Sequence, residues 1–353
     1  MTGRNDNIEP FTSVAPGRLC LFGEHQDYLG LPVIALALPL CCSIRVTPIA
    51  KSTVLTLTFQ NKIWSVDMNQ LPPRQNSNDD MQDFALAAVH EVVEAGWDIQ
   101  CGAECVSQTD IPLQSGCSSS SAFCISWVQV LAKLSNVAIA PMELAQMAHR
   151  AEVLHFGAPG GTMDHVTSAI GGILRIGPGM WDYEQLDQPN EGVWVLADSG
   201  QPKDTLGHLK RCKFDRLALF ERLGENWNND CTTLSAYETR LLETTRTNLQ
   251  MEQQAASEWN LASGMTLGGC MDRHHCALRD GLELSTPRLE RMREAALQSG
   301  AWGFKVVGSG GGGCGVAWSS NDCAVEVGKA MESAGSIKTW IVRTAFPGAH
   351  IVA

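Results

Sequence analysis

The alternation of apolar and polar positions predicts a strand-rich N-terminal region. Val33 to Val46 is apolar and rich in β-forming residues, and Thr53 to Phe59 alternates β-branched with apolar residues. A short apolar strand is predicted over Leu19 to Phe22, and Cys101 to Val106 has the composition of a further strand. The polar, proline-containing stretch Leu71 to Asp80 is expected to form a surface loop.

Helical spacing of apolar residues begins after this loop. Asp83 to Ala95 carries its apolar residues on one side of a helix, and Ala122 to Leu134 is predicted as an apolar helix. A further helix is predicted over Pro141 to Phe156, because the first turn of a helix tolerates proline. Gly157 to Gly161 ends this helix, and Val166 to Ile176 follows with a glycine pair inside it.

The second half of the chain has a different order of elements. A change in composition near Gly177 to Glu191 predicts two domains, residues 1–180 and residues 190–353. Val193 to Ala197 is a predicted strand, and several helical stretches fill residues 205–278. From residue 287 to residue 342 the pattern is helix, strand, glycine-rich loop, strand, helix and strand. That order indicates an α+β fold with a split βαβ arrangement in the second domain.

Composition and charge exclude several classes of protein. The 353 residues are 44% hydrophobic and 18% charged, which is typical of a globular protein. A formal net charge of -12 disfavours nucleic-acid binding, because phosphate contacts need clustered lysine and arginine. The N-terminal residues lack the apolar region of a secretory signal, and the longest apolar run, Leu31 to Cys42, is too short to span a bilayer. The 13 cysteines are therefore expected to be reduced thiols of a cytoplasmic protein.

Polar side chains crowd into the segment Ala15 to Gly30, around the end of the predicted strand Leu19 to Phe22. They are Arg18 before the turn and Glu24, His25, Asp27 and Tyr28 within it. Carboxylates beside a histidine suit a polyhydroxylated ligand, because each hydroxyl group both donates and accepts hydrogen bonds. The alternative is an ordinary polar turn after a strand.

A run of serines, Ser118 to Ser121, precedes the predicted helix Ala122 to Leu134. The first backbone N–H groups of a helix lack partners and carry partial positive charge, so small residues there let phosphate oxygens approach. Serine hydroxyls add hydrogen-bond donors or a ligand for Mg²⁺. An acidic protein can hold ATP in this way, although an ordinary helix cap has the same composition.

Two further segments carry residues suited to phosphoryl transfer. Lys305 to Gly315 holds five glycines in the six positions from Gly308 to Gly313, which indicates close backbone approach or left-handed turns. It matches neither a Walker A loop nor the dinucleotide-binding fingerprint. Ala151 to His165 supplies the carboxylates Glu152 and Asp164, of the kind that bind Mg²⁺ and orient an attacking hydroxyl group.

In this order, the segments resemble the motifs of the GHMP kinase family in their galactokinase form. The matching stretches are Pro16 to Gly30, Ile111 to Ala122, Met163 to His165, His274 to Glu290 and Lys305 to Gly315. The resemblance implies a two-domain α+β GHMP kinase fold, with an N-terminal ribosomal-protein-S5-domain-2-like domain, a C-terminal ferredoxin-like domain and an active site in the interdomain cleft. It implies transfer of the γ-phosphoryl group of MgATP to a sugar hydroxyl, with the anomeric hydroxyl of D-galactose as the leading acceptor.

The resemblance also implies a role for each site residue. Asp164 would be the base or orienter for the sugar hydroxyl, and Arg18 would stabilise charge at the reacting oxygens. Ser120 and Glu152 would hold Mg²⁺. The sugar would be bound by Glu24, His25, Asp27 and Gly161, the phosphates by Gly116, Cys117, Ser118, Ser119 and Ser120, and the loop closing around the site would contain Gly310, Gly311 and Gly312.

Four departures from the galactokinase pattern leave the identity of the acceptor open. Gln26 to Leu29 stands where galactokinases usually carry Thr-Asp-Tyr-Asn, His165 stands where glutamine is usual, and Cys117 stands where leucine is usual. Galactokinases also place a sugar-contacting tyrosine early in the second domain, and Asp198 to Arg216 contains no tyrosine.

Three alternatives follow from the same residues. A mevalonate-type kinase shares the segment Leu21 to His25, although Asp27 suits a polyol better than an aliphatic acid. A sugar sensor without turnover would be expected to lose a catalytic residue, and Asp164, Arg18 and Glu152 are all present. A zinc site is disfavoured by its ligand spacing; its members would be Cys270, His274, His275 and Cys276.

Overall fold

The N-terminal part of the protein is built on a sheet of eight strands. The structure is a computed structural model that describes residues 8–75, 77, 80–158, 160–202, 208, 210–224, 227 and 234–353. The strands are β1 (Phe11–Phe22), β2 (Val33–Ile49), β3 (Val54–Phe59), β4 (Lys62–Asp67), β5 (Gly102–Thr109), β6 (Ile173–Ile176), β7 (Tyr183–Leu186) and β12 (His350–Val352). The main path runs β12-β1-β2-β5-β3-β4, and β6 and β7 extend from β2. The β3–β5 pair is parallel and the other pairs are antiparallel.

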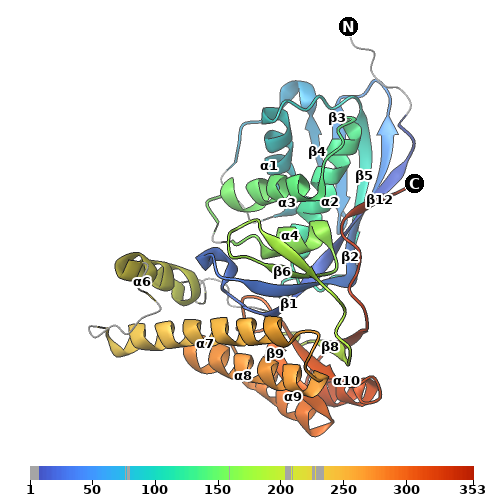
Figure 1. Ribbon diagram of the computed structural model, residues 1–353. Coiled ribbons are helices and arrows are strands. Elements are labelled where there is room, and N and C mark those ends of the chain that lie inside the picture. The colour runs from blue at the N-terminus through green and yellow to red at the C-terminus, as the bar shows by residue number, and fades with distance from the viewer. Residues whose placement is uncertain are drawn as a thin grey trace.

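Four helices pack beside this sheet, as Figure 1 shows. They are α1 (Met81–Glu94), α2 (Ser119–Leu134), α3 (Pro141–His149) and α4 (Met163–Ile170). Because α2 and α4 pack directly on β1 and β2, their N-terminal ends come close to the turn that follows β1. Of the apolar residues predicted for one side of α1, Ala87, Ala88 and Val92 are buried, whereas Val93 is exposed.

The C-terminal part is a four-stranded antiparallel sheet with helices. Its strands are β8 (Val193–Asp198), β9 (Ala301–Val306), β10 (Cys314–Ser319) and β11 (Lys338–Val342), in the order β11-β8-β10-β9. Its helices are α6 (Asp215–Leu223), α7 (Ala236–Glu258), α8 (Gly264–Leu282), α9 (Pro287–Gln298) and α10 (Ala324–Ser333). Helices separate β8 from β9 and α10 separates β10 from β11, so the predicted ferredoxin-like arrangement is confirmed.

The two parts share a hydrophobic core across β8. Successive side chains of a strand point to opposite faces of the sheet. Trp194 and Leu196 accordingly join the core that contains β1 and β2, while Val195 and Ala197 join a second core under α9 and α10. The four-stranded sheet is therefore packed on both faces, and one face supports the N-terminal part.

Most predicted elements are confirmed, and the differences have local causes. β1 begins at Phe11 rather than at the predicted Leu19, because an irregular pairing between Pro16 and Arg18 interrupts its alternation. The predicted helix Pro141 to Phe156 is α3 followed by a π-helical turn, Arg150–Leu154. The predicted segment Val166 to Ile176 divides into the end of α4 and β6, with both glycines of its pair at positive φ.

The last strand returns to the start of the chain. β12 pairs with β1, so the C-terminal segment lies on the N-terminal sheet, as the red trace of Figure 1 shows. The domain limits at residues 180 and 190 stay a prediction. Parts of the helical stretch predicted over residues 205–278, namely residues 205–207, 209, 225–226 and 228–233, lie outside the described residues. Among the residues that the structure describes, none of the helices has the length and apolar character needed for a membrane span.

Candidate active site

Two cavities meet between the turn after β1, the start of α2 and the glycine-rich loop after β9. The smaller cavity, of about 170 Å³, is lined by residues that include Glu24, His25, Asp27, Tyr28, Glu152 and Gly161. The larger cavity, of about 760 Å³, is lined by residues that include Phe59, Phe84, Gly116, Ser118, Ser119 and Ser120. Both are also lined by Arg18, Asp164, Gly308 and Ser309. A group bound in one cavity is thus next to a group bound in the other.

Arg18 and Asp164 form an ion pair at this junction. The Arg18 Nε lies 2.6 Å from the Asp164 Oδ1, and the Arg18 Nη1 donates to the carbonyl of Gly116. Burial alone would lower the pKa of Arg18, but the carboxylate of Asp164 raises it above its usual value. Burial alone would raise the pKa of Asp164, and the charge of Arg18 holds it below its usual value. Both groups are therefore ionised at neutral pH.

The backbone explains how these two side chains reach the junction. Arg18 follows the irregular pairing in β1, and such irregularities re-aim side chains. Its own N–H group donates to the carbonyl of Cys117. This hydrogen bond ties β1 to the serine-rich loop, Gln114 to Ser121. Asp164 lies in the first turn of α4, directly after the glycine-rich break that was predicted from the sequence.

The serine-rich loop leads into α2 through left-handed backbone. Gly116 has a φ of 92° and Ser118 a φ of 59°. The Cβ of any other residue at Gly116 would lie 2.4 Å from the carbonyl oxygen of Val307, so the loop touches the segment after β9. The buried hydroxyl group of Ser309 has no hydrogen-bond partner among the described residues, and that of Ser118 faces the carboxylate of Asp164. The free backbone N–H groups at the start of α2 suit phosphate oxygens.

The residues that the resemblance assigned to the phosphate-binding loop and the closing loop differ in what they contact. The Cys117 side chain is buried, and the backbone carbonyl of Cys117 accepts from Arg18. Gly308 and Ser309 line both cavities. Gly310, Gly311 and Gly312, which the resemblance assigned to the closing loop, lie against Leu284 and the carbonyls of Gln201 and Pro202. The structure thus brings the first two residues of the glycine-rich loop to the junction.

Glu152 reaches the smaller cavity from the π-helical turn after α3. Such turns change the direction of side chains within a helix and are frequent at functional sites. The Glu152 Oε2 lies 2.7 Å from the His165 Nε2, and both side chains are largely buried. Burial alone would raise the pKa of Glu152, but His165 and Ser120 hold it below its usual value. Glu152 therefore presents a charged carboxylate close to the serine-rich loop.

Ser120 and Glu152 are suited to Mg²⁺ by the chemistry of their oxygen atoms. Mg²⁺ prefers oxygen ligands and is commonly bound by one or two carboxylates together with substrate phosphates. Over the described ranges there is no group of three or more histidine, cysteine or acidic side chains placed to hold a metal ion. A site with one carboxylate and one hydroxyl group fits a metal that phosphate oxygens help to hold.

Glu24 forms a buried ion pair that the sequence analysis did not identify. The Lys305 Nζ lies 2.6 Å from the Glu24 Oε2 and 2.7 Å from the carbonyl oxygen of Val306. The side chains are 0% and 2% exposed. A lysine inside an otherwise apolar strand was the available signal, because lysine is almost never buried without a partner. Lys305 thus fixes the carboxylate of Glu24 at the smaller cavity.

Asp27 is held near Asp164 by the start of α4. The Met163 N–H group donates to the Asp27 Oδ2 over 3.2 Å. Burial, and then the charge of Asp164, raise the pKa of Asp27 to about 6. The neighbouring His25 is neutral, because burial and then the charge of Arg216 lower its pKa to about 3.

The raised pKa of Asp27 predicts a pH dependence of acceptor use. A protonated Asp27 loses its charge and one hydrogen-bond acceptor, so kcat/KM for the acceptor is expected to fall as the pH drops through about 6. Initial rates measured between about pH 5 and pH 8 would show this fall of kcat/KM. Asp27→Asn should have a lower kcat/KM throughout this range and should lack the fall at low pH. An unchanged fall in this variant would assign it to another group.

Gly161 leaves no room for a side chain beside Asp27. An added Cβ would lie 1.8 Å from the Asp27 Oδ2. Gly161→Ala is therefore expected to displace Asp27 and raise the KM for the acceptor about tenfold, the cost of one lost hydrogen bond, with the KM for ATP nearly unchanged. Steady-state kinetics would test this. Gly269→Ala is the matched control, since its Cβ meets only an Arg273 nitrogen at 3.9 Å.

Apolar side chains that line the larger cavity were also missed by the sequence analysis. They are Phe59, Met81, Phe84 and Leu113. Flat apolar surfaces of this kind suit a heteroaromatic ring, and the serine-rich loop suits phosphates. These residues come from β3, α1 and the loop before α2, so only the folded chain brings them together.

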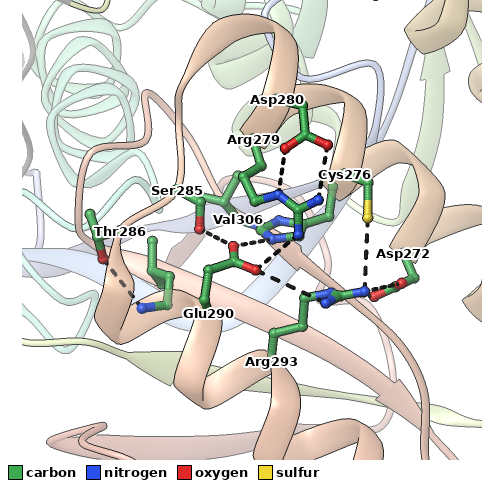
Figure 2. Close-up of polar contacts among 11 residues, drawn as sticks. Asp272, Cys276, Arg279, Asp280, Ser285, Thr286, Glu290, Arg293 and Val306 are labelled. Atoms are coloured by element: carbon green, nitrogen blue, oxygen red, sulfur yellow. Dashed lines mark hydrogen bonds and ion pairs between the residues drawn. The ribbon is translucent and has the colours of Figure 1, made fainter.

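Two residues of the alternative zinc site, His275 and Cys276, contact protein groups that leave them unsuited to a metal ion. His275 accepts from the Val306 N–H group over 3.1 Å and lies 2.9 Å from Glu290. The Cys276 Sγ lies 3.8 Å from an Arg293 nitrogen, a cation that would repel a metal ion. Figure 2 shows Cys276, Glu290 and Arg293 within one network of ion pairs between α8 and α9. This network braces the strand that carries Lys305.

Three protein-family models match the chain. The model of the GHMP kinases N-terminal domain matches residues 83–172, and that of the GHMP kinases C-terminal domain matches residues 259–337. The galactokinase galactose-binding signature matches residues 4–48. The three matches contain Arg18, Asp164 and the serine-rich and glycine-rich loops.

Known proteins of two kinds are similar over nearly the whole chain. A mevalonate kinase of Pyrococcus abyssi is 26% identical over 330 residues, which cover 92% of this chain and 91% of that protein. A galactokinase of Haemophilus influenzae is 24% identical, with 99% of this chain and 97% of that protein covered.

Solved structures show the same fold. Lactococcus lactis galactokinase complexed with galactose has a TM-score of 0.84 at 19% identity, covering 97% of this chain and 95% of that chain. Methanococcus jannaschii mevalonate kinase has a TM-score of 0.75 at 19% identity, and the match covers 98% of this chain and 100% of that chain.

Proposed function

Because the chain belongs to the GHMP kinase family, whose members are phosphotransferases, we propose that it transfers the γ-phosphoryl group of ATP to a hydroxyl group of a polyhydroxylated small molecule. A hexose of the galactose type is the first candidate acceptor, at its anomeric hydroxyl. The observation that carries the proposal is the junction of the two cavities at Arg18 and Asp164. The larger cavity has the serine-rich loop for phosphates, and the smaller one has the carboxylates for hydroxyl groups.

The Arg18–Asp164 pair supplies the chemistry that phosphoryl transfer needs. Asp164 is ionised and accepts the proton of the attacking hydroxyl group, or orients that group. Arg18 stays charged throughout and stabilises the negative charge of the transferred group without giving up a proton. Mg²⁺, held by Ser120 and Glu152, supplies charge neutralisation on the phosphates when it is bound.

The acceptor is proposed from the side chains of the smaller cavity. Asp27, Glu24 and His25 offer several acceptors and one neutral histidine within about 170 Å³. This arrangement suits a molecule with several hydroxyl groups, and the galactose-binding signature over residues 4–48 supports a sugar. The similarity to mevalonate kinases supports mevalonate as the second candidate. A sensor that binds a sugar without turnover is disfavoured by the intact Arg18–Asp164 pair.

An ADP-release assay with a panel of acceptors tests the proposal. The panel contains galactose, glucose, N-acetylgalactosamine, arabinose, fucose, mannose, glucuronate and mevalonate, each with MgATP. Acceptor-dependent ADP release that Asp164→Asn abolishes would support the proposal and identify the acceptor. Release with mevalonate alone would replace the sugar by the second candidate. Sugar binding in a thermal-shift assay without any turnover would favour the sensor.

A further inference from the structure

Arg216 lies in the first turn of α6 and joins three separate segments of the chain. Its side chain is fully buried. The Nε atom donates to the Cys212 carbonyl over 2.6 Å, and the Nη1 atom donates to the Thr245 hydroxyl group of α7 over 3.1 Å. The Nη2 atom donates to the carbonyl of His25 and, over 3.4 Å, to the hydroxyl group of Tyr28. Arg216 thus bonds the turn after β1 to two segments of the C-terminal part.

Arg216 acts through hydrogen bonds to neutral groups rather than through an ion pair. All four of its acceptors are neutral oxygen atoms, and no carboxylate of the described residues lies within 4.0 Å of its nitrogen atoms. The guanidinium group is planar, and its N–H donors point in fixed directions. It therefore fixes where the four acceptors lie relative to one another, which the flexible ammonium group of a lysine could not do.

The backbone of His25 is held in an uncommon conformation. Its φ is 63°, in the left-handed region that residues other than glycine seldom adopt. Such a conformation persists where the surrounding contacts determine it. Within the turn, the Gln26 N–H group donates to the Gly23 carbonyl, and the Gln26 side chain donates to the Pro32 carbonyl. The bond from Arg216 fixes the His25 carbonyl from outside the turn and so stabilises this conformation.

The residues that Arg216 contacts on the turn belong to the smaller cavity. His25 and Tyr28 line it, and so does Asp27, which lies between them in the sequence. The Tyr28 hydroxyl group also donates to the Cys212 carbonyl over 3.0 Å and lies 2.8 Å from the His25 Nδ1. Arg216 itself lines neither cavity. It can therefore act on a bound molecule only by placing the side chains of the turn.

We propose that Arg216 is a positioning residue of the acceptor site, and that it fixes the turn that carries His25, Asp27 and Tyr28 from the C-terminal part. This inference rests on the proposed function and adds a residue through which the C-terminal part determines acceptor binding. None of the four residues that Arg216 contacts lines the larger cavity. Binding of the nucleotide, proposed to occupy that cavity, should therefore not depend on Arg216.

Steady-state kinetics on both substrates test this selectivity. Arg216→Met keeps a long side chain and removes its N–H groups. The KM for the acceptor is expected to rise about 10- to 100-fold, as lost charge-assisted hydrogen bonds would cost, with the KM for ATP nearly unchanged. Arg216→Lys keeps the charge but not the four bonds, so it should show a smaller rise of the same kind. It also carries the test if Arg216→Met does not fold.

The matched control is Arg222→Met, the same substitution elsewhere on α6. Arg222 is more than half exposed and contacts Glu238 of α7. Its replacement should leave both KM values unchanged, because it touches neither the turn after β1 nor the cavities.

Hydrogen exchange of the free protein, followed by mass spectrometry, gives a readout that needs neither acceptor nor turnover. The peptide that covers Gly23 to Gly30 is expected to exchange faster in both Arg216 variants than in the wild type. The serine-rich loop should exchange as in the wild type, and Arg222→Met should leave both segments unchanged. A general loss of stability would instead speed exchange in both segments.

Faster exchange of the turn with a selective rise in the KM for the acceptor would support the inference. Unchanged exchange of the turn, or an equal rise in both KM values, would overturn it while the kinase proposal stands. If no acceptor were phosphorylated, the proposed function would fail, and galactose binding by calorimetry would replace the KM. Binding as tight in Arg216→Lys as in the wild type would then overturn the role of Arg216, and absence of both turnover and galactose binding would overturn both.

Discussion

Replacing Asp164 with asparagine is expected to lower kcat by about 10²- to 10⁴-fold, the usual contribution of a positioned general base. The reason is local, since Asp164 lies at the only described ion pair that both cavities share, with its oxygen 2.6 Å from the Arg18 Nε. Asparagine keeps the shape of the side chain and loses its proton affinity. The KM for ATP should change little, because the larger cavity, proposed to hold the nucleotide, is lined mainly by other residues. Steady-state kinetics on both substrates would measure the two effects.

The control for Asp164→Asn is a check that the variant is still folded. Arg18 keeps the Gly116 carbonyl as a partner when the charge of Asp164 is removed. The buried Arg18 cation nevertheless loses its carboxylate partner, so a lower melting temperature is expected, and circular dichroism at the assay temperature must show that the variant is folded. If Asp164→Asn kept more than about a tenth of the wild-type kcat, general-base catalysis by Asp164 would be contradicted.

Replacing Lys305 with methionine is expected to lower the free energy of unfolding by about 3–5 kcal/mol. The substitution leaves the Glu24 carboxylate buried at 2% exposure without its cation. A buried charge that loses its partner keeps the full cost of its desolvation. Urea unfolding followed by circular dichroism would measure the difference.

A double variant separates charge from packing at this pair. Glu24→Gln combined with Lys305→Met removes both charges and is expected to recover a large part of the lost stability, because two neutral side chains need no mutual compensation. Lys329→Met, at an exposed ion pair, should change the free energy of unfolding by less than about 1 kcal/mol. A loss for Lys305→Met as small as that of Lys329→Met would show that the Glu24–Lys305 pair adds no stability.

The sequence predicted those parts of the site that are encoded by short segments. The turn after β1 and the serine run before α2 each span a few residues, and Glu152 and Asp164 both lie within Ala151 to His165. Composition and order were therefore enough to identify them. The fold class was predicted for the same reason, since the order of helices and strands after residue 287 is typical of a split βαβ unit. These predictions depend on local patterns.

The parts that the sequence did not predict depend on contacts between distant segments. Glu24 and Lys305 are 281 positions apart, and only the packing of β9 beneath the turn after β1 joins them. The apolar lining of the larger cavity comes from three separate segments, β3, α1 and the loop before α2. Tyr28 and Cys212, whose hydrogen bond joins the turn after β1 to the C-terminal part, are 184 positions apart. Pairings of this kind appear only when the chain is folded.

The most direct test of the central claim is to follow the γ-phosphoryl group of radiolabelled ATP in a single turnover. The account predicts that the label appears on the acceptor with the wild-type protein. With Asp164→Asn the label should stay on ATP, although calorimetry should still detect nucleotide binding. Label that appeared only as inorganic phosphate, or that reached the acceptor equally fast with Asp164→Asn, would contradict the assignment of the Arg18–Asp164 junction as the place of transfer.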